Sequence, residues 1–271
     1  MTIAFRVIDD ESHSPEFNMA ADLFCMESCE HNSFIYLRLY QWKPPCVTIG
    51  YMQKASQLLD FQSLNRDGMS WIRRPTGGRT VLHHHDITYS CIFPNSILSM
   101  GKTILESYSI ISQCLIAGLE HAGIQCNSND SFDDLKKTNR EIKLPCFLAP
   151  NRKEIMVIGK KLIGSAQKRI ANAVLQHGSI PITDAYRRLP DYLLLSDEQK
   201  KIQKELLVKK STCLKEIDPK IKLPETRQAL IKGFVKSLPF KSIEKPWTDE
   251  EIEKIEAIAN SKEFRMQWMG E

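Results

Sequence analysis

Two stretches of the sequence carry residue types that could do chemistry. The first, RRPTGGRTVLHHHDITYSCIF over residues 73–93, joins arginines to a Gly-Gly pair and to three consecutive histidines. Guanidinium groups bind phosphates and acyl oxygens, and glycines let a backbone approach a ligand closely. The second, LPCFLAP around Cys146, is followed fifteen residues later by Lys161. A neighbouring ammonium group raises the thiolate fraction of a cysteine, so this pair could supply a nucleophile.

The triple histidine does not predict a metal centre. In a continuous strand, successive side chains point to opposite faces, so His83 and His85 would share one face and His84 would lie on the other. Three adjacent histidines cannot easily converge on one ion, and no second cluster of ligands accompanies them in the sequence. We therefore expect no metal, with one histidine in a site and the other two elsewhere.

Spacing alone leaves simpler alternatives open for both stretches. The Gly-Gly segment matches neither the phosphate loop GxxxxGK nor the dinucleotide pattern GxGxxG, and it can equally be a hairpin turn that exposes its arginines. In the same way, Cys146 can be a small buried residue and Lys161 a solvated lysine of a strand.

Composition and charge limit the class of protein. The chain has 271 residues, of which 42% are hydrophobic and 26% charged, so it can form one large domain or a domain with an appendage. A net charge of +4 without a clustered basic stripe gives no indication of nucleic-acid binding. No apolar run approaches the ~18 residues of a membrane span, and we expect no membrane association.

The start of the chain and its cysteines indicate the compartment. The first ten residues, MTIAFRVIDD, turn acidic where a secretory signal would continue apolar. The eight cysteines form no CxxC pair and no disulfide grid. We expect a reduced, cytoplasmic protein.

Apolar periodicity and turn residues predict a mixed α/β body followed by helices. We expect strands at 5–9, 33–40, 46–50 and 173–182, a hairpin of 70–74 with 80–93 around the Gly-Gly turn, and a second hairpin at 154–169 that turns at Gly159-Lys160. We expect helices at 18–30, 103–123 and 224–238, capping boxes at Ser196/Gln199 and Thr248/Glu251, and a polar loop at 124–145. The expected division is a catalytic domain at 1–185 and a helical segment at 186–271 packed on it.

Several stretches together resemble one known superfamily. RRPTGGRTVLHHHDITYS, CFLAPNRKEIMVIGKKLIGSAQKR and LQHGSIPI are similar to lipoate–protein ligases and octanoyltransferases, which are related in fold to biotin–protein ligases. EFNMAAD and LYQWKPPCVTIGYMQ give weaker support, and the matches follow the family's order from residue 16 to residue 182. The resemblance implies an α/β (α+β) fold with mixed, largely antiparallel sheets flanked by helices.

The Cys-Phe pair before the lysine hairpin resembles the octanoyltransferase branch that works through an acyl-cysteine. The resemblance implies that Cys146 is the acyl-accepting nucleophile. It also implies that Lys161 lowers the pKa of this thiol and polarises the acyl carbonyl. The residues that would line the pocket for the acyl group and the cofactor arm are Arg74, Gly77, Gly78, Arg79, His83, Gly164, Ser165, Gln167 and His177.

The implied activity is transfer of an octanoyl or lipoyl group from acyl carrier protein to a lysine of a lipoyl-domain acceptor. Such an acceptor would be the glycine cleavage H protein or a 2-oxoacid dehydrogenase E2 domain. The acceptor amine must lose a proton, and His83, His84 or His177 is the candidate base. We expect no cofactor and a monomer.

Three alternatives remain at this point. An ATP-dependent lipoate ligase would use ATP and Mg²⁺ to make a lipoyl-adenylate, held by Arg74, the Gly-Gly turn and Lys161. An amidotransferase would move octanoyl between lipoyl-domain proteins by the same cysteine chemistry. A module that binds acyl groups or carriers would have the pocket without turnover.

Overall fold

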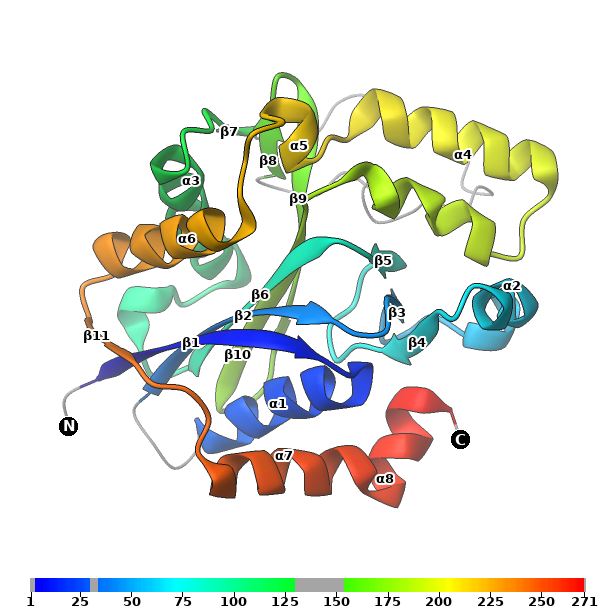
Figure 1. Cartoon of the computed structure of the whole chain (residues 1–271). Coiled ribbons are helices and arrows are strands. Elements are labelled where there is room, and N and C mark those ends of the chain that lie inside the picture. The colour runs from blue at the N-terminus through cyan, green and yellow to red at the C-terminus, as the bar shows by residue number, and fades with distance from the viewer. Residues whose placement is uncertain (1–2, 30–33, 130–153, 271) are drawn as a thin grey trace.

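A computed structural model describes residues 3–29, 34–129 and 154–270 of the chain. It has an eight-stranded sheet in the order β11-β1-β2-β6-β10-β9-β8-β7 and a three-stranded sheet in the order β4-β3-β5 (Figure 1). Antiparallel pairs predominate, and parallel pairs join β1 to β2, β1 to β11 and β3 to β4. The expected mixed, largely antiparallel α/β architecture is confirmed.

The elements have the following bounds. The strands are β1 (Ala4–His13), β2 (Phe34–Trp42), β3 (Cys46–Ile49), β4 (Ser70–Arg73), β5 (Val81–His83), β6 (Asp86–Pro94), β7 (Asn127–Asn129), β8 (Glu154–Val157), β9 (Lys160–Arg169), β10 (Ala173–Pro181) and β11 (Lys241–Glu244). The α-helices are α1 (Pro15–Ser28), α2 (Phe61–Arg66), α3 (Ile104–His121), α4 (Asp197–Lys210), α5 (Leu214–Ile217), α6 (Leu223–Ser237), α7 (Asp249–Asn260) and α8 (Lys262–Phe264), and a nine-residue 3₁₀ segment covers Asp184–Tyr192.

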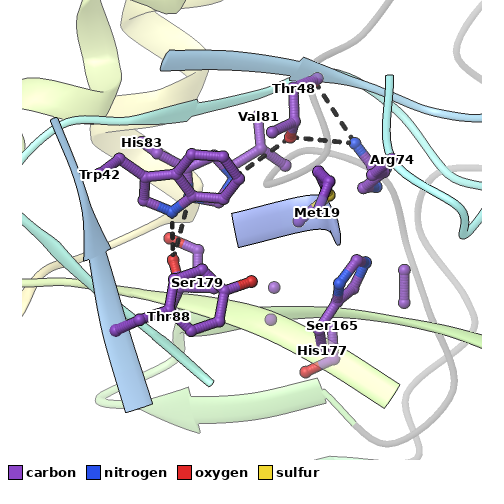
Figure 2. A pocket seen from close by; sticks show the side chains of 14 residues that line it. Met19, Trp42, Thr48, Arg74, Val81, His83, Thr88, Ser165, His177 and Ser179 are labelled. Atoms are coloured by element: carbon purple, nitrogen blue, oxygen red, sulfur yellow. Dashed lines mark hydrogen bonds between the residues drawn. The ribbon is translucent and has the colours of Figure 1, made fainter. Parts of the chain in front are cut away.

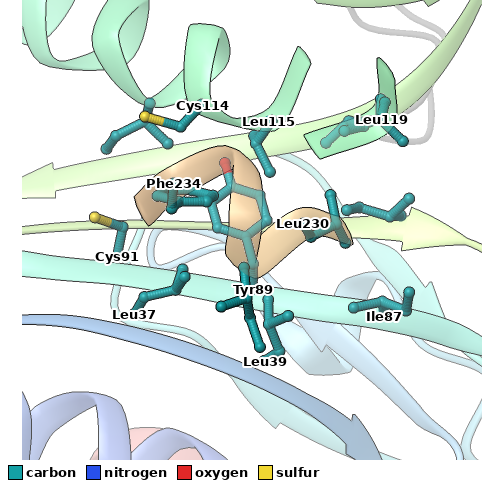
Figure 3. Packing of buried hydrophobic residues seen from close by; sticks show 14 of the residues in the cluster. Leu37, Leu39, Ile87, Tyr89, Cys91, Cys114, Leu115, Leu119, Leu230 and Phe234 are labelled. Carbon is teal, nitrogen blue, oxygen red and sulfur yellow. The ribbon is translucent and has the colours of Figure 1, made fainter. Parts of the chain in front are cut away.

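Successive side chains of each strand point to opposite faces of the large sheet, and helices pack against each face. Phe5 and Val7 of β1 face the layer of α3 and α6, whereas Ile8 faces α1. On the first face, Leu37 and Leu39 of β2 pack with side chains from the two helices (Figure 3). Helix α1 covers the opposite face, and α7 packs on the outer side of α1 (Figure 1). The large sheet is therefore buried on both sides, which holds the strands that carry the site in fixed register.

Most elements lie where the sequence predicts them. The strands at 5–9, 33–40, 46–50 and 173–182, the 154–169 hairpin and the helices at 18–30, 103–123 and 224–238 are confirmed within the described residues, with shifts of a few residues at their ends. The two expected capping boxes are also present. The second hairpin turns at Ile158 and Gly159, which both have positive φ, one residue earlier than expected. In the expected polar loop at 124–145, residues 127–129 form β7, and residues 130–153 lie outside the described residues.

The hairpin expected around the Gly-Gly turn is wrong. Strands β4 and β5 do not pair with each other, because β3 lies between them, parallel to β4 and antiparallel to β5. The connection from residue 74 to residue 80 therefore crosses the end of β3 as a wide loop. A tight turn cannot span an intervening strand, so the glycines serve a different purpose here.

The single strand expected at 80–93 is also wrong. It is two strands, β5 in the small sheet and β6 in the large one, and His84 and His85 form the bend between them. His85 has a positive φ of 54°. The bend moves the chain from one sheet to the other, so His83 and His85 do not share a strand face as we expected.

Residues 186–270 pack closely against the rest of the chain. Strand β11 extends the large sheet beside β1, α6 packs on α3, and α7 packs on α1. Arg6 of β1 donates to the carboxylate of Glu251 at the start of α7, with an Nη1–Oε1 distance of 2.6 Å. This segment therefore contributes a strand and core residues as well as helices. Among the described residues, no helix combines the length and the apolar character that crossing a membrane requires.

Two glycines let α3 and α6 cross in direct backbone contact. A Cβ added at Gly233 would lie 2.2 Å from the backbone nitrogen of Gly118, and a Cβ added at Gly118 would lie 2.7 Å from the Cα of Leu230. Neither position has room for a side chain unless the helices separate. The α3–α6 layer therefore depends on these two residues.

We predict that Gly233→Ala lowers the free energy of unfolding by about 3 kcal/mol or more, because the methyl group overlaps backbone atoms that cannot move aside. Urea unfolding followed by circular dichroism measures the change. Lys232→Ala, at the exposed neighbouring position of the same helix, is the control and should change the midpoint little. Equal stabilities for the two variants would show that the helices can separate without cost.

Candidate functional site

A cavity lies between the two sheets and the start of α1. It holds about 360 Å³ including its open mouth. Its walls are Met19, Tyr40, Trp42, Thr48, Arg74, Val81, His83, Thr88, Gly164, Ser165, Ala166, His177, Gly178 and Ser179. Figure 2 shows the side chains of Met19, Arg74 and His177 among those that line the cavity. An apolar lining with a few convergent polar groups is typical of a small-molecule site.

The guanidinium of Arg74 is buried and already engaged by protein oxygens. Its Nε donates to Thr76 Oγ1 at 3.2 Å, and its Nη1 donates to Thr48 Oγ1 at 3.3 Å. Its Nη2 donates to the carbonyl oxygens of Gly77 at 2.8 Å and Arg79 at 2.7 Å. Arg74 therefore holds the wide loop after β4 against β3 (Figure 2).

The close approach of this loop to the end of β3 explains why residue 50 is a glycine. Gly50 follows β3, and a Cβ at this position would lie 2.1 Å from the carbonyl oxygen of Gly78. The amide of Tyr51 donates to the carbonyl of Thr76 at 3.0 Å. Only a residue without a side chain allows the loop to lie this close to the end of β3.

The first histidine of the site, His177 on β10, lies in a buried row with Asp22 and Thr76. Its Nδ1 is 3.1 Å from Asp22 Oδ2 on α1, and its Nε2 is 2.7 Å from Thr76 Oγ1. Burial lowers the pKa of His177, and the positive charge of Arg74 acts in the same direction, whereas Asp22 opposes the shift. His177 is therefore neutral at pH 7.

The second histidine, His83 at the end of β5, has the same type of surroundings. Its Nδ1 is 2.8 Å from Asp86 Oδ2, and its Nε2 is 3.1 Å from Thr48 Oγ1. Its ring stacks on Trp42 with 4.4 Å between the ring centroids. Ser179 donates to the same oxygen of Asp86 at 2.6 Å, so this carboxylate is fixed from two strands.

A second buried arginine holds the Asp22 end of the site. Arg38 of β2 donates to Asn18 Oδ1 at 2.6 Å and to Asp10 Oδ2 at 2.8 Å, and it lies 3.5 Å from Asp22 Oδ1. Burial alone would raise the pKa of Asp10, but the hydrogen bond with His13 and the charge of Arg38 bring it well below its usual range. The carboxylates around Arg38 therefore remain paired with it.

Lys161 lies outside this cavity lining. It is buried near the start of β9, and its Nζ donates to Glu154 Oε1 of β8 at 2.6 Å. Its backbone carbonyl accepts a hydrogen bond from the amide of Thr212 at 3.0 Å. The alternative that Lys161 is a solvated strand lysine is therefore wrong, because the side chain is enclosed and ion-paired.

The structure brings together part of the expected site. The expected residues that line the cavity are Arg74, His83, Gly164, Ser165 and His177. The other expected residues in the described part of the chain are not among those that line the cavity: Gly77, Gly78 and Arg79 lie on the loop that Arg74 holds, the amide of Gln167 donates to Gln176 and to Ser107 of α3, and Lys161 pairs with Glu154. Cys146 lies outside the described residues. Of the three histidines in a row, one lines the cavity, as expected.

Several residues of the site were missed from sequence. They are Asp22, Trp42, Thr48, Thr76 and Asp86. Asp22 and Trp42 fall within EFNMAAD and LYQWKPP, which carried part of the resemblance, so a signal existed for these two. Thr48, Thr76 and Asp86 also fall within stretches that carried the resemblance, but nothing in their local pattern shows that they are buried or which side chain each one contacts. Among the described residues, no cluster of three or more His, Cys, Asp or Glu side chains could hold a metal ion.

Comparison with known proteins assigns the family. The family profile described as the lipoyl protein ligase A/B catalytic domain matches residues 14–235. The chain belongs to this family. Octanoyltransferase LipM from Geobacillus kaustophilus is 34% identical over 275 residues, covering 97% of each chain. Octanoyltransferase LipM from Staphylococcus aureus is 32% identical over 280 residues, covering 99% of each. The chain is thus an enzyme of the octanoyltransferase branch of the superfamily.

Solved structures agree with the fold. The crystal structure of lipoate-protein ligase A bound with ATP has a TM-score of 0.76 at 21% identity, covering 98% of this chain and 99% of that one. A bi-partite lipoate protein ligase from Thermoplasma acidophilum, solved in work that includes its E2 lipoyl domain, has a TM-score of 0.77 at 20% identity, covering 98% and 97%. At these identities the likeness establishes the shared architecture.

The lowered pKa of His177 predicts a pH dependence of stability. Because the unfolded state binds a proton near pH 6.5 and the folded state resists it, the contribution of His177 is complete above pH 6.5 and is lost as the pH falls below that value. We predict that His177→Gln makes the slope of unfolding free energy against pH shallower, by up to about 1.4 kcal/mol per pH unit. Urea unfolding between neutral and mildly acidic pH measures the slope.

His121→Gln, at the exposed end of α3, is the matched control for this measurement and should keep the slope of the unaltered protein. His84, whose pKa burial also lowers, contributes equally in all three proteins. If His177→Gln and the unaltered protein lose stability in parallel, His177 is not held neutral by its surroundings.

Proposed function

We propose that the protein transfers an octanoyl group from acyl carrier protein to a lysine of a lipoyl domain through an acyl-cysteine on Cys146. The observation that carries this proposal is the combination of octanoyltransferase relatives that match almost the whole chain with a partly enclosed, mostly apolar cavity whose lining includes two buried histidines. The apolar walls suit an acyl chain, and the histidines suit proton transfer at its reactive end.

The other cysteines support Cys146 by elimination. The sequence has eight cysteines, and the seven in the described residues are all buried. Burial raises the pKa of every one of these thiols, to about 12 for Cys29 and Cys114 and to about 11 for Cys126. A thiol with a raised pKa is a poor nucleophile at neutral pH. Cys146 is the remaining candidate.

The proposed reaction has two steps. The Cys146 thiolate attacks the octanoyl thioester, and the thiolate of the carrier leaves, so one thioester replaces another at little cost in energy. The ε-amine of the acceptor lysine then attacks the acyl-cysteine, an amide forms, and the cysteine thiolate is released. Dividing a transfer at a covalent intermediate replaces one difficult step with two easier ones. Since a thioester is already activated, we propose that neither ATP nor a metal is required.

The acceptor amine must lose a proton, because an ammonium with a pKa of about 10.4 cannot attack at neutral pH. His83 and His177 line the cavity, whereas His84 lies in the bend beyond β5, so we propose His83 or His177 as the base. We propose that Lys161 lowers the pKa of the Cys146 thiol. Its ion pair with Glu154 fixes the ammonium at the start of β9.

One second candidate follows from a specific observation. The ATP-bound lipoate-protein ligase A structure has the same architecture over nearly the whole chain, so the fold alone is compatible with an ATP-dependent ligase. A ligase would need ATP with Mg²⁺ and would retain most of its activity without Cys146. An amidotransferase between lipoyl-domain proteins would use the same cysteine, and it differs in accepting an octanoylated lipoyl domain as donor.

We predict that incubation with octanoyl acyl carrier protein adds the mass of one octanoyl group to the protein, and that a lipoyl domain then removes it. Intact-protein mass spectrometry follows both steps. Cys146→Ser should form no such adduct, because a serine hydroxyl is not ionised at neutral pH. Cys213→Ser, which alters a buried thiol, is the control and should form the adduct as the unaltered protein does.

Two outcomes would contradict the proposal. An adduct that persists in Cys146→Ser would place the acyl group on another residue. Lipoyl-domain modification by Cys146→Ser that depends on added ATP and lipoate would establish the ligase instead.

A further inference from the structure

The two histidines of the cavity are connected to one arginine. We propose that Arg74 is a positioning residue that fixes the tautomer of both His83 and His177, acting through the hydroxyl groups of Thr48 and Thr76. Its role in catalysis rests on the proposed function. The hydrogen-bond arrangement itself can be tested without any substrate.

The arginine takes up one lone pair of each threonine hydroxyl, and the single proton of each hydroxyl needs an acceptor. A guanidinium donates and never accepts, so the hydroxyl oxygens of Thr76 and Thr48 accept from Arg74 Nε and Nη1. Each hydroxyl has one proton of its own to donate. The nitrogen within reach is His177 Nε2 at 2.7 Å for Thr76 and His83 Nε2 at 3.1 Å for Thr48. Each threonine therefore donates to a histidine.

The carboxylates impose the same direction from the other side. An ionised carboxylate only accepts, so the Nδ1 atoms of His177 and His83 carry the protons that bond to Asp22 and Asp86. In the neutral form of either ring only one nitrogen is protonated, so in that form Nε2 is the acceptor. Both ends of each row thus specify the same tautomer, with a proton on Nδ1 and a lone pair on Nε2.

Because the residues of both rows are buried, the preference for this tautomer over the alternative is strong. The relative exposures are 4% for Arg74, 0% for Thr76 and 1% for Thr48, and they are 5% for His177 and 6% for His83. Where water cannot replace a lost partner, an unpaired polar group is costly and the alternative tautomers are disfavoured. Because one guanidinium serves both rows, a change at Arg74 affects both histidines together.

The inference changes the role of Arg74. Its three nitrogen atoms donate to protein oxygens, so it prepares the histidines rather than presenting a charge to the acyl substrate. A histidine whose Nε2 carries a lone pair is a neutral imidazole, and a neutral imidazole is the form that can take up a proton during transfer of an acyl group to an amine.

Nuclear magnetic resonance tests the arrangement. Long-range proton–nitrogen correlation spectra distinguish the two tautomers of each of the seven histidines, and His83→Gln and His177→Gln assign the two rings. We expect both rings as Nδ1–H tautomers at neutral pH. Thr76→Val should alter the ring signals of His177 alone, and Thr48→Val those of His83 alone. Arg74→Met should alter both.

Thr226→Val is the matched control, because this buried threonine donates to the carbonyl of Lys222 on α6 and touches neither histidine. It should leave both rings unchanged. The threonine variants keep the inference testable if Arg74→Met does not fold. Nε2–H tautomers in the unaltered protein, or an Arg74→Met variant in which only one ring or neither ring changes, would overturn the inference.

Activity provides a second readout. Transfer of octanoyl from octanoyl acyl carrier protein to a lipoyl domain should fall in kcat by about 10- to 100-fold in Arg74→Met, with a displaced acid limb of the pH profile. An unchanged kcat and pH profile would overturn the catalytic part of the inference. If the unaltered protein transfers no octanoyl while the tautomer pattern holds, the proposed function fails and the positioning role of Arg74 stands.

Discussion

The site depends on one buried cation at the junction of two sheets. Arg74 follows β4, and its guanidinium reaches the loop carbonyls, Thr48 of the neighbouring strand and Thr76. A buried charge of this kind is tolerated only when its donors are satisfied. The protein oxygens around Arg74 meet that requirement, and in doing so they fix the side chains that face the cavity.

Each of the two histidines is also hydrogen-bonded to a carboxylate, which another part of the fold positions. Asp22 comes from α1, where Arg38 holds it, and Asp86 begins β6 directly after the histidine bend. Because helices cover both faces of the large sheet, packing holds these carboxylates in place. Histidines held between a carboxylate and a hydroxyl have defined tautomers. The mostly apolar cavity therefore contains two imidazole groups that can accept or donate a proton.

The sequence predicted where the helices and strands lie along the chain better than which strands pair with each other. Strand alternation and helix periodicity located most elements, and the 196–199 and 248–251 capping boxes were correct, since these signals are local. The predicted Gly-Gly hairpin was wrong because β3 lies between β4 and β5. Residue spacing within a segment does not show which other strand of the chain lies beside it. His83 and His177 came from the resemblance, but their partners Thr48 and Thr76 did not, since burial creates their role.

Hydrogen–deuterium exchange of the full chain tests most directly whether Arg74 holds this junction together. In Arg74→Met, the amide of Tyr51, which donates to the carbonyl of Thr76, should exchange much faster than in the unaltered protein, because the loop loses the donors to Gly77 and Arg79. The amides of β10 and β6 should retain their protection. Unchanged exchange at Tyr51 would contradict the central role given to this guanidinium.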